Sequence, residues 1–168
     1  MNANTINKKK VKEELFSCIA ADNLAGVKHA IEQGADIRAA HIHDYSPLMH
    51  SALLGHLEIV KYLHQQGADI NDIDMWLDTP LLLSAGNGHL ACVKYLHQQG
   101  VNLDEHNISG NTALTLSAYR GYLEVVKYLV EQGADMNILG RADKTALQLA
   151  KENNCKDVVK FLKAKGAK

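Results

Sequence analysis

The feature that most constrains this chain of 168 residues is a repeat with a period of 33 residues that runs along its length. Four columns of the repeat keep one residue type without exception: Gly34, Gly67, Gly100, Gly133 and Gly166; Leu15, Leu48, Leu81, Leu114 and Leu147; Val27, Val60, Val93, Val126 and Val159; Lys28, Lys61, Lys94, Lys127 and Lys160. A period of roughly 20 to 50 residues is typical of stacked units that pack on their neighbours. The sequence therefore predicts a stack of similar units.

Each unit has the signals of two short helices. Thr79-Pro80-Leu81 places a hydroxyl at the N-cap and proline at the first helical position, and comparable starts occur at Ser46, Thr112 and Thr145. A glycine such as Gly88 then ends the first helix, and a second helix runs to the next glycine of the period. Asp- and Asn-rich stretches such as 68–78 carry turn signals, so we expect them to project as fingers.

These segments closely resemble the ankyrin repeat. The resemblance is carried by residues 46–71 (SPLMHSALLGHLEIVKYLHQQGADIN) and by the matching segments 79–103, 112–137 and 145–168. It implies an all-α repeat fold, an ankyrin-repeat solenoid of about five helical hairpins with β-turn fingers. We expect a flexible tail over residues 1–8 and one domain over 9–168, with a capping unit at 9–38, full repeats from about 39, 72 and 105, and a C-terminal capping repeat from about 138.

One column departs from the family pattern. The histidine that normally follows Thr-Pro-Leu is replaced by Met49, Leu82, Thr115 and Gln148. The hydrogen bond that this imidazole makes to the turn in the family must therefore be replaced by packing or by other polar groups.

Composition and motifs exclude several classes of function. No apolar run is long enough to span a membrane, and Lys12, Glu13 and Glu14 lie where a signal peptide would need its hydrophobic region. The three cysteines are an odd number and indicate free thiols, a reducing compartment and a cytoplasmic location. Phosphate-binding loops, zinc-protease motifs and nucleophile elbows are absent from the sequence, so we expect neither an enzyme nor a cofactor.

Histidine is the one residue type that raises a metal-site alternative. His64 and His97 occupy equivalent positions in successive units, about 10 Å apart, which is too far to share one zinc ion. His41, His43 and Asp44 form a local cluster with metal-like ligands, but the spacing identifies no further ligands that would complete a site. A metal- or small-ligand-binding protein that uses this cluster is the alternative function, and no metal is predicted.

Charge is unevenly distributed along the chain. No Lys or Arg lies between Lys61 and Lys94, whereas this stretch contains several aspartates: Asp69, Asp72, Asp74 and Asp78. From Arg141 onward the balance is basic, which fits either a solubilising end unit or a docking end for an acidic partner. Nucleic acid is not expected as a partner, because these lysines have no aromatic stacking residues among them.

The remaining functional feature is an exposed surface of fingers and adjoining helix ends. Trp76, the single tryptophan of the chain, is expected at a finger tip, where it either anchors a partner or folds back and seals the stack. The candidate protein-binding residues are Tyr45, Met75, Trp76, Leu77, Asp78, Asn111, Tyr119 and Arg120. We expect a monomeric, non-catalytic module that binds another protein as inhibitor, regulator or adaptor, with the aspartates near Trp76, Asp74 among them, as a charged rim.

Overall fold

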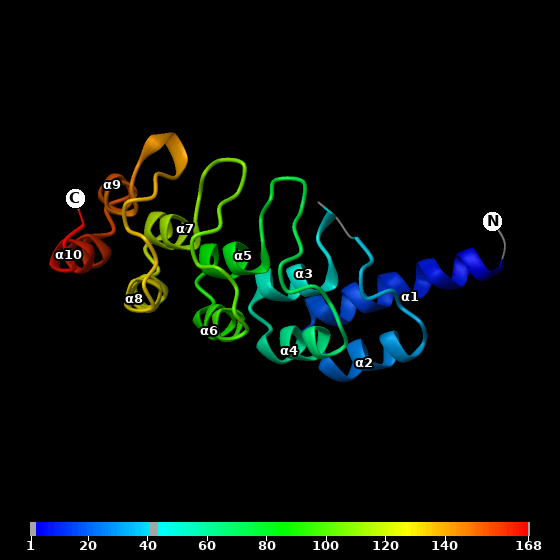
Figure 1. Cartoon of the computed structure of the whole chain (residues 1–168). Helices are drawn as coiled ribbons and strands as arrows, with labels where there is room; N and C mark the ends of the chain where they lie inside the picture. The colour runs from blue at the N-terminus through cyan, green and yellow to red at the C-terminus, as the bar shows by residue number, and fades with distance from the viewer. Residues whose placement is uncertain (1–2, 41–43, 168) are drawn as a thin grey trace.

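The structure, a computed structural model, describes residues 3–40 and 44–167 and consists of helix pairs stacked side by side (Figure 1). The first helices of the pairs form one row: α1 (Ala3–Ala20), α3 (Pro47–Leu54), α5 (Pro80–Gly86), α7 (Ala113–Arg120) and α9 (Ala146–Glu152). The second helices form the other row: α2 (Leu24–Glu32), α4 (Leu57–Gln65), α6 (Leu90–Gln98), α8 (Leu123–Glu131) and α10 (Lys156–Ala164). Over the described ranges there is no β-strand, and the predicted all-α solenoid with projecting fingers is confirmed.

The first helices begin at the predicted hydroxyl caps. Thr79 Oγ1 accepts a hydrogen bond from Leu82 N at 3.2 Å, and Ser46, Thr112 and Thr145 cap their helices in the same way. Two of the residues that replace the family histidine, Met49 and Leu82, are buried by packing. The other two complete capping boxes, because Thr115 Oγ1 and Gln148 Oε1 each accept a hydrogen bond from the N–H of their N-cap residue. Both expected kinds of replacement therefore occur.

The second helices end slightly earlier than the predicted position at the glycine of the period. α4 ends at Gln65, and Gly67 follows in the left-handed conformation with a φ of 90°. Gly67 N donates to His64 O at 2.9 Å, and Ala68 N donates to Leu63 O at 3.0 Å. These two bonds satisfy the last carbonyls of the helix, and the conformation favours glycine, which explains the repeated glycine column.

Successive pairs are joined by a contact that also requires a glycine. His89 Nε2 forms a hydrogen bond with Leu53 O at 2.9 Å, at the end of the preceding first helix. Gly55, which ends that helix with a φ of 80°, lies so close that a Cβ would stand 2.4 Å from His89 Nδ1. A side chain at position 55 would therefore displace the imidazole that connects the two repeats.

The apolar columns form the core between the two rows of helices. All five leucines of the leucine column are buried, and so are four of the five valines of the valine column. Val159, the fifth valine, lies in the last helix pair of the described chain and is half-buried.

The N-terminal helix corrects one prediction. Residues 1–8 were expected to form a flexible tail, but α1 begins at Ala3, so residues 3–8 belong to the helix. Its first described side chains are exposed, and Lys9 Nζ lies 3.8 Å from Glu13 Oε1 one turn further on. Such i,i+4 pairs favour continuation of an exposed helix. The predicted boundaries between the repeats remain predictions.

Candidate functional site

The fingers over residues 68–78 and 101–111 share one backbone design, in which a polar side chain at the base holds the turn, whereas the equivalent residue of the finger over 134–144 is Gly140. Asp74 Oδ1 accepts hydrogen bonds from Trp76 N and Asp78 N, both at 2.8 Å. In the next finger, Asn107 Oδ1 accepts from Ser109 N at 3.0 Å and from Asn111 N at 3.1 Å. Each side chain thus satisfies two N–H groups of the turn and holds the finger tip in place.

Hydrogen bonds also connect each finger to the next. Ile108 N donates to Trp76 O at 2.9 Å, and Asn107 Nδ2 donates to Asp78 Oδ1 at 2.7 Å. The following finger is attached through Arg141 N, which donates to Asn111 Oδ1 at 2.9 Å. The fingers over residues 68–78, 101–111 and 134–144 therefore form one continuous edge along the stack, which we call the finger edge.

Large apolar side chains are exposed along the finger edge. Met75 at 64% and Ile108 at 62% are the most exposed of them, and Trp76 is 36% exposed. Together they form what we call the apolar finger row: Ile73, Met75, Trp76, Leu77, Ile108 and Leu139. Among the described residues, Leu54 is the single exposed large apolar side chain outside this row. Exposed apolar side chains gathered in one region mark an interaction surface.

Leu77 adopts an unfavourable backbone conformation within this row. Its φ is 60°, in the left-handed region where a bulky side chain costs about 1 kcal/mol. The equivalent residue of the next finger is Gly110, which has a φ of 74°. The finger over residues 68–78 therefore carries an exposed leucine at a position where glycine would adopt the backbone conformation at a lower cost in free energy.

A groove lies between the finger over residues 68–78 and the finger over residues 101–111. It has a volume of about 480 Å³, and its lining includes the apolar side chains of Ile73 and Leu77. Asp104 and Glu105 line it as well, so an apolar surface is bordered here by carboxylates. This groove was not among the sequence predictions, because it depends on how two fingers lie side by side.

The predicted binding residues divide into exposed and buried groups. Met75, Trp76, Leu77 and Arg120 are exposed, whereas Tyr45, Asp78 and Tyr119 are half-buried. Tyr119 lies beneath Arg141, whose guanidinium carbon is 5.9 Å from the ring centroid. Asn111 is buried, and its side-chain oxygen is occupied by the backbone of the next finger. Asn111 therefore supports the finger edge from inside.

Asp74 differs from the prediction that it belongs to a charged rim. Its side chain is 4% exposed, because it turns inward to bind the N–H groups of its own finger. The charge of Asp74 also contributes to the raised pKa values of two neighbouring side chains, Tyr45 and Asp78. Burial raises the pKa of Tyr45, and the nearby Asp74 and Asp78 raise it further. Burial and Asp74 likewise raise the pKa of Asp78, while the hydrogen bond from Asn107 opposes this shift. Asp74 therefore stabilises the turn of its own finger and does not belong to an exposed charged rim.

Pairs of histidine and tyrosine join the second helices of successive repeats. His64 Nδ1 lies 2.8 Å from the Tyr95 hydroxyl, and His97 Nδ1 lies 2.8 Å from the Tyr128 hydroxyl. The spacing of 31 residues is a signal that the sequence analysis missed. In the last two repeats, Val130 stands in the histidine column and Phe161 in the tyrosine column, so neither the imidazole nor the hydroxyl is present in this pair.

The metal alternative finds no support in the described residues. Over residues 3–40 and 44–167 no group of three or more His, Cys, Asp or Glu side chains is arranged to hold a metal ion. His41 and His43 lie outside the described residues, and Asp44 is exposed. In the same ranges, no helix combines the length and the hydropathy that crossing a bilayer requires.

A stack of helix pairs with projecting loops defines the class of this chain as a helical solenoid. The family described as ankyrin repeats (three copies) matches residues 2–74, 72–140 and 105–168. The chain belongs to the ankyrin-repeat family, whose members are generally protein–protein interaction modules. A search of curated proteins returned no similar sequence.

Proposed function

We propose that this chain is a non-catalytic module that binds a partner protein through the finger edge. The observation that carries this proposal is the apolar finger row, which exposes six large apolar side chains on loops that are hydrogen-bonded to one another. A pre-organised loop edge loses little conformational entropy on binding, and exposed Trp and Met are typical anchors of protein interfaces.

The charge around the apolar finger row specifies the partner further. Near Ile73 to Leu77 and in the adjoining groove the charged side chains are acidic, and they are half-buried: Asp72, Asp78, Asp104 and Glu105. At the far end of the row, next to Leu139, the charged side chain is the exposed Arg141. No Lys or Arg lies between Lys61 and Lys94. The partner surface should therefore present an apolar pocket bordered by basic residues.

The thiols support a location in a reducing compartment such as the cytoplasm. Cys18, Cys92 and Cys155 are all free. Burial raises the pKa of the Cys92 thiol to about 11, so this thiol stays protonated at neutral pH. Free thiols in a folded protein are typical of reducing compartments, where we propose that the chain acts as a monomer.

The experiment uses the whole chain as bait in a lysate of its source, followed by affinity measurements with the identified partner. Trp76→Ala is expected to weaken binding by at least about 2 kcal/mol, because an anchor at the centre of an interface is lost. Glu131→Ala, an exposed change at the end of α8, is the matched control and should leave affinity unchanged. If Trp76→Ala lowers the melting temperature by several degrees and leaves affinity intact, Trp76 seals the stack and the proposal is wrong.

A further inference from the structure

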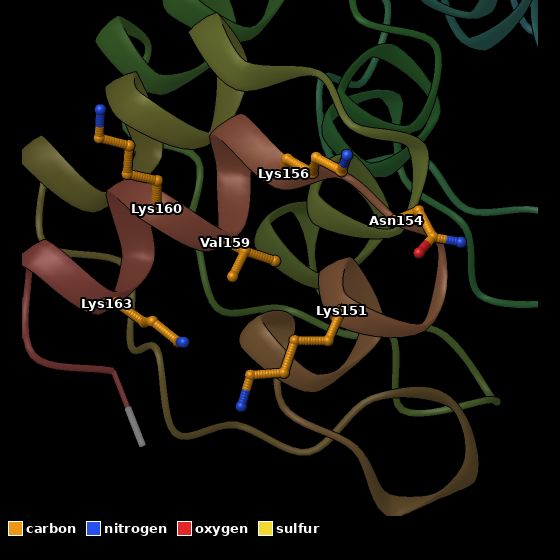
Figure 2. Close-up of a pocket in the computed structure, with 6 residues that line it drawn as sticks. All are labelled: Lys151, Asn154, Lys156, Val159, Lys160 and Lys163. Atoms are coloured by element: carbon orange, nitrogen blue, oxygen red, sulfur yellow. The ribbon is translucent and has the colours of Figure 1, made fainter.

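The open end of the stack carries a basic hollow that is distinct from the finger edge. It has a volume of about 430 Å³ and lies on α9, α10 and the turn between them (Figure 2). Its lining consists of Lys151, Asn154, Lys156, Val159, Lys160 and Lys163. None of these residues belongs to the apolar finger row.

The register of the repeats explains why this face is open. Lys151, Lys156 and Lys163 occupy the columns that hold Ala118, Leu123 and Val130 in the preceding repeat. Those three residues are buried in the core or packed against it. In the last repeat the same columns face outward and carry ammonium groups. The hollow is therefore the surface on which a further repeat would pack.

The hollow has charge of a single sign. Its four lysines make no ion pair with any described residue, and no acidic residue lines it. Of the two acids that adjoin these lysines in sequence, Glu152 is paired with Lys144, and Asp157, next to Lys156 on α10, does not line the hollow. Lys160 is four residues from Lys156 and three from Lys163 on α10, and like charges at these spacings destabilise a helix.

Solubility of an end repeat does not require this arrangement. An end repeat needs a polar outer face, and mixed charges supply one. The first repeat has such a mixed surface, because α1 carries exposed lysines and glutamates and pairs Lys9 with Glu13. The positive charge that lines the hollow at the other end has no ion-pair partner among the described residues, and capping alone does not require such an arrangement.

We propose that this basic hollow is a second docking surface, which binds an acidic, extended segment of a partner protein. Figure 2 shows Lys151 and Lys163 extending to the same side of Val159, while Lys156 and Lys160 extend in other directions. Ammonium groups distributed around a rim suit several carboxylates along a chain better than one small anion. Val159, half-buried at the centre, offers an apolar surface for a side chain between those carboxylates.

Other anionic partners fit this surface less well. Single-stranded nucleic acid is bound by aromatic stacking together with basic residues, and the lining contains neither an aromatic residue nor arginine. Binding to a membrane surface needs large apolar side chains that insert among the lipids. The exposed large apolar residues of the described chain lie on the fingers and at Leu54, not on α9 or α10.

The test measures fluorescence anisotropy of a labelled peptide in which glutamates flank a central leucine. Wild-type protein should bind it with an affinity that falls as salt rises. Lys151→Gln combined with Lys163→Gln should weaken binding roughly five- to tenfold, as expected for two lost exposed ion pairs. Lys156→Gln with Lys160→Gln is a second variant with the same expectation, and circular dichroism verifies that both fold.

Matched controls separate this site from general charge and from the finger edge. Lys8→Gln with Lys10→Gln removes the same charge from exposed positions of α1 and should leave peptide affinity unchanged. Trp76→Ala should also leave it unchanged, so a failure of the finger proposal would not affect this result. The proposal is overturned if wild-type protein does not bind the peptide, or if the α1 control weakens binding equally. Tighter binding to phosphatidylserine vesicles or to a DNA oligonucleotide would also overturn it.

Discussion

The helices and the fingers of the same repeats use the 33-residue period differently. In the helices, the leucine column is buried in every repeat, so the same residue type packs in the core of each repeat. In the fingers, the base position changes from Asp74 to Asn107, which make the same two hydrogen bonds, and then to Gly140, and the next position changes from Met75 to Ile108 to Arg141. The comparison shows that the helices define the stack and that the finger tips are free to define what it binds.

The largest expected effect is in the helices. Leu114→Ala should reduce the free energy of unfolding by about 2–5 kcal/mol, because this leucine is 1% exposed and its loss leaves a cavity. Ile108→Ala on the neighbouring finger tip is the control and should change stability by less than about 0.5 kcal/mol. Urea denaturation measures both. If the two variants lose equal free energies of unfolding, the conclusion that the helices and not the finger tips stabilise the stack is contradicted.

A smaller loss of stability is expected at Asp74, the base of the finger over residues 68–78. Asp74→Ala should cost about 1–3 kcal/mol, because Trp76 N and Asp78 N lose their acceptor. Asp74→Asn should be tolerated, since Asn107 performs the same task one repeat further on. Thermal and urea melts of the two variants test this. A large loss for Asp74→Asn would show that the negative charge itself is needed.

The smallest effect is expected at the hydrogen bonds between second helices. Tyr128→Phe should reduce the free energy of unfolding by about 0.5–1.5 kcal/mol, because it removes the hydroxyl that meets His97 Nδ1. Tyr62→Phe is the matched control, since Ile31 stands where the histidine partner would be. Similar losses in both variants, measured in parallel denaturation curves, would show that the pair does not stabilise the stack.

The stack of helix pairs could be predicted from sequence because its signals are local and repeated. Hydroxyl caps, the glycine of each period and the valine and leucine stripes all depend on residues within one unit. The start of α1 was missed because it follows from an exposed helix that continues ahead of the repeat pattern. Met75 and Leu77 were expected at the finger tip and are exposed there, whereas for Trp76 the sequence left open whether the ring faces solvent or seals the stack.

The finger interior could not be predicted in the same way. Whether Asp74 points inward or outward depends on which N–H groups the turn leaves without a partner, and this is not visible in a pattern of polar residues. Asn111 was expected at the surface, but the backbone of the next finger covers it. The groove beside Leu77 and the basic hollow both depend on how neighbouring repeats are placed, which becomes visible in the folded chain.

The division of the core into two clusters has a mechanical consequence. One cluster joins the first helix pair to Leu48, Ile59 and Leu63 of the second pair, and the other runs from Ala52 and Val60 of that same pair to the C-terminal end. Tension applied between the two termini acts on the repeat interfaces in series, because the main contacts of each pair are with adjacent pairs. A chain stretched in this way should separate first between the first and second helix pairs, where the packing between consecutive pairs is sparsest, and the remaining repeats would stay folded.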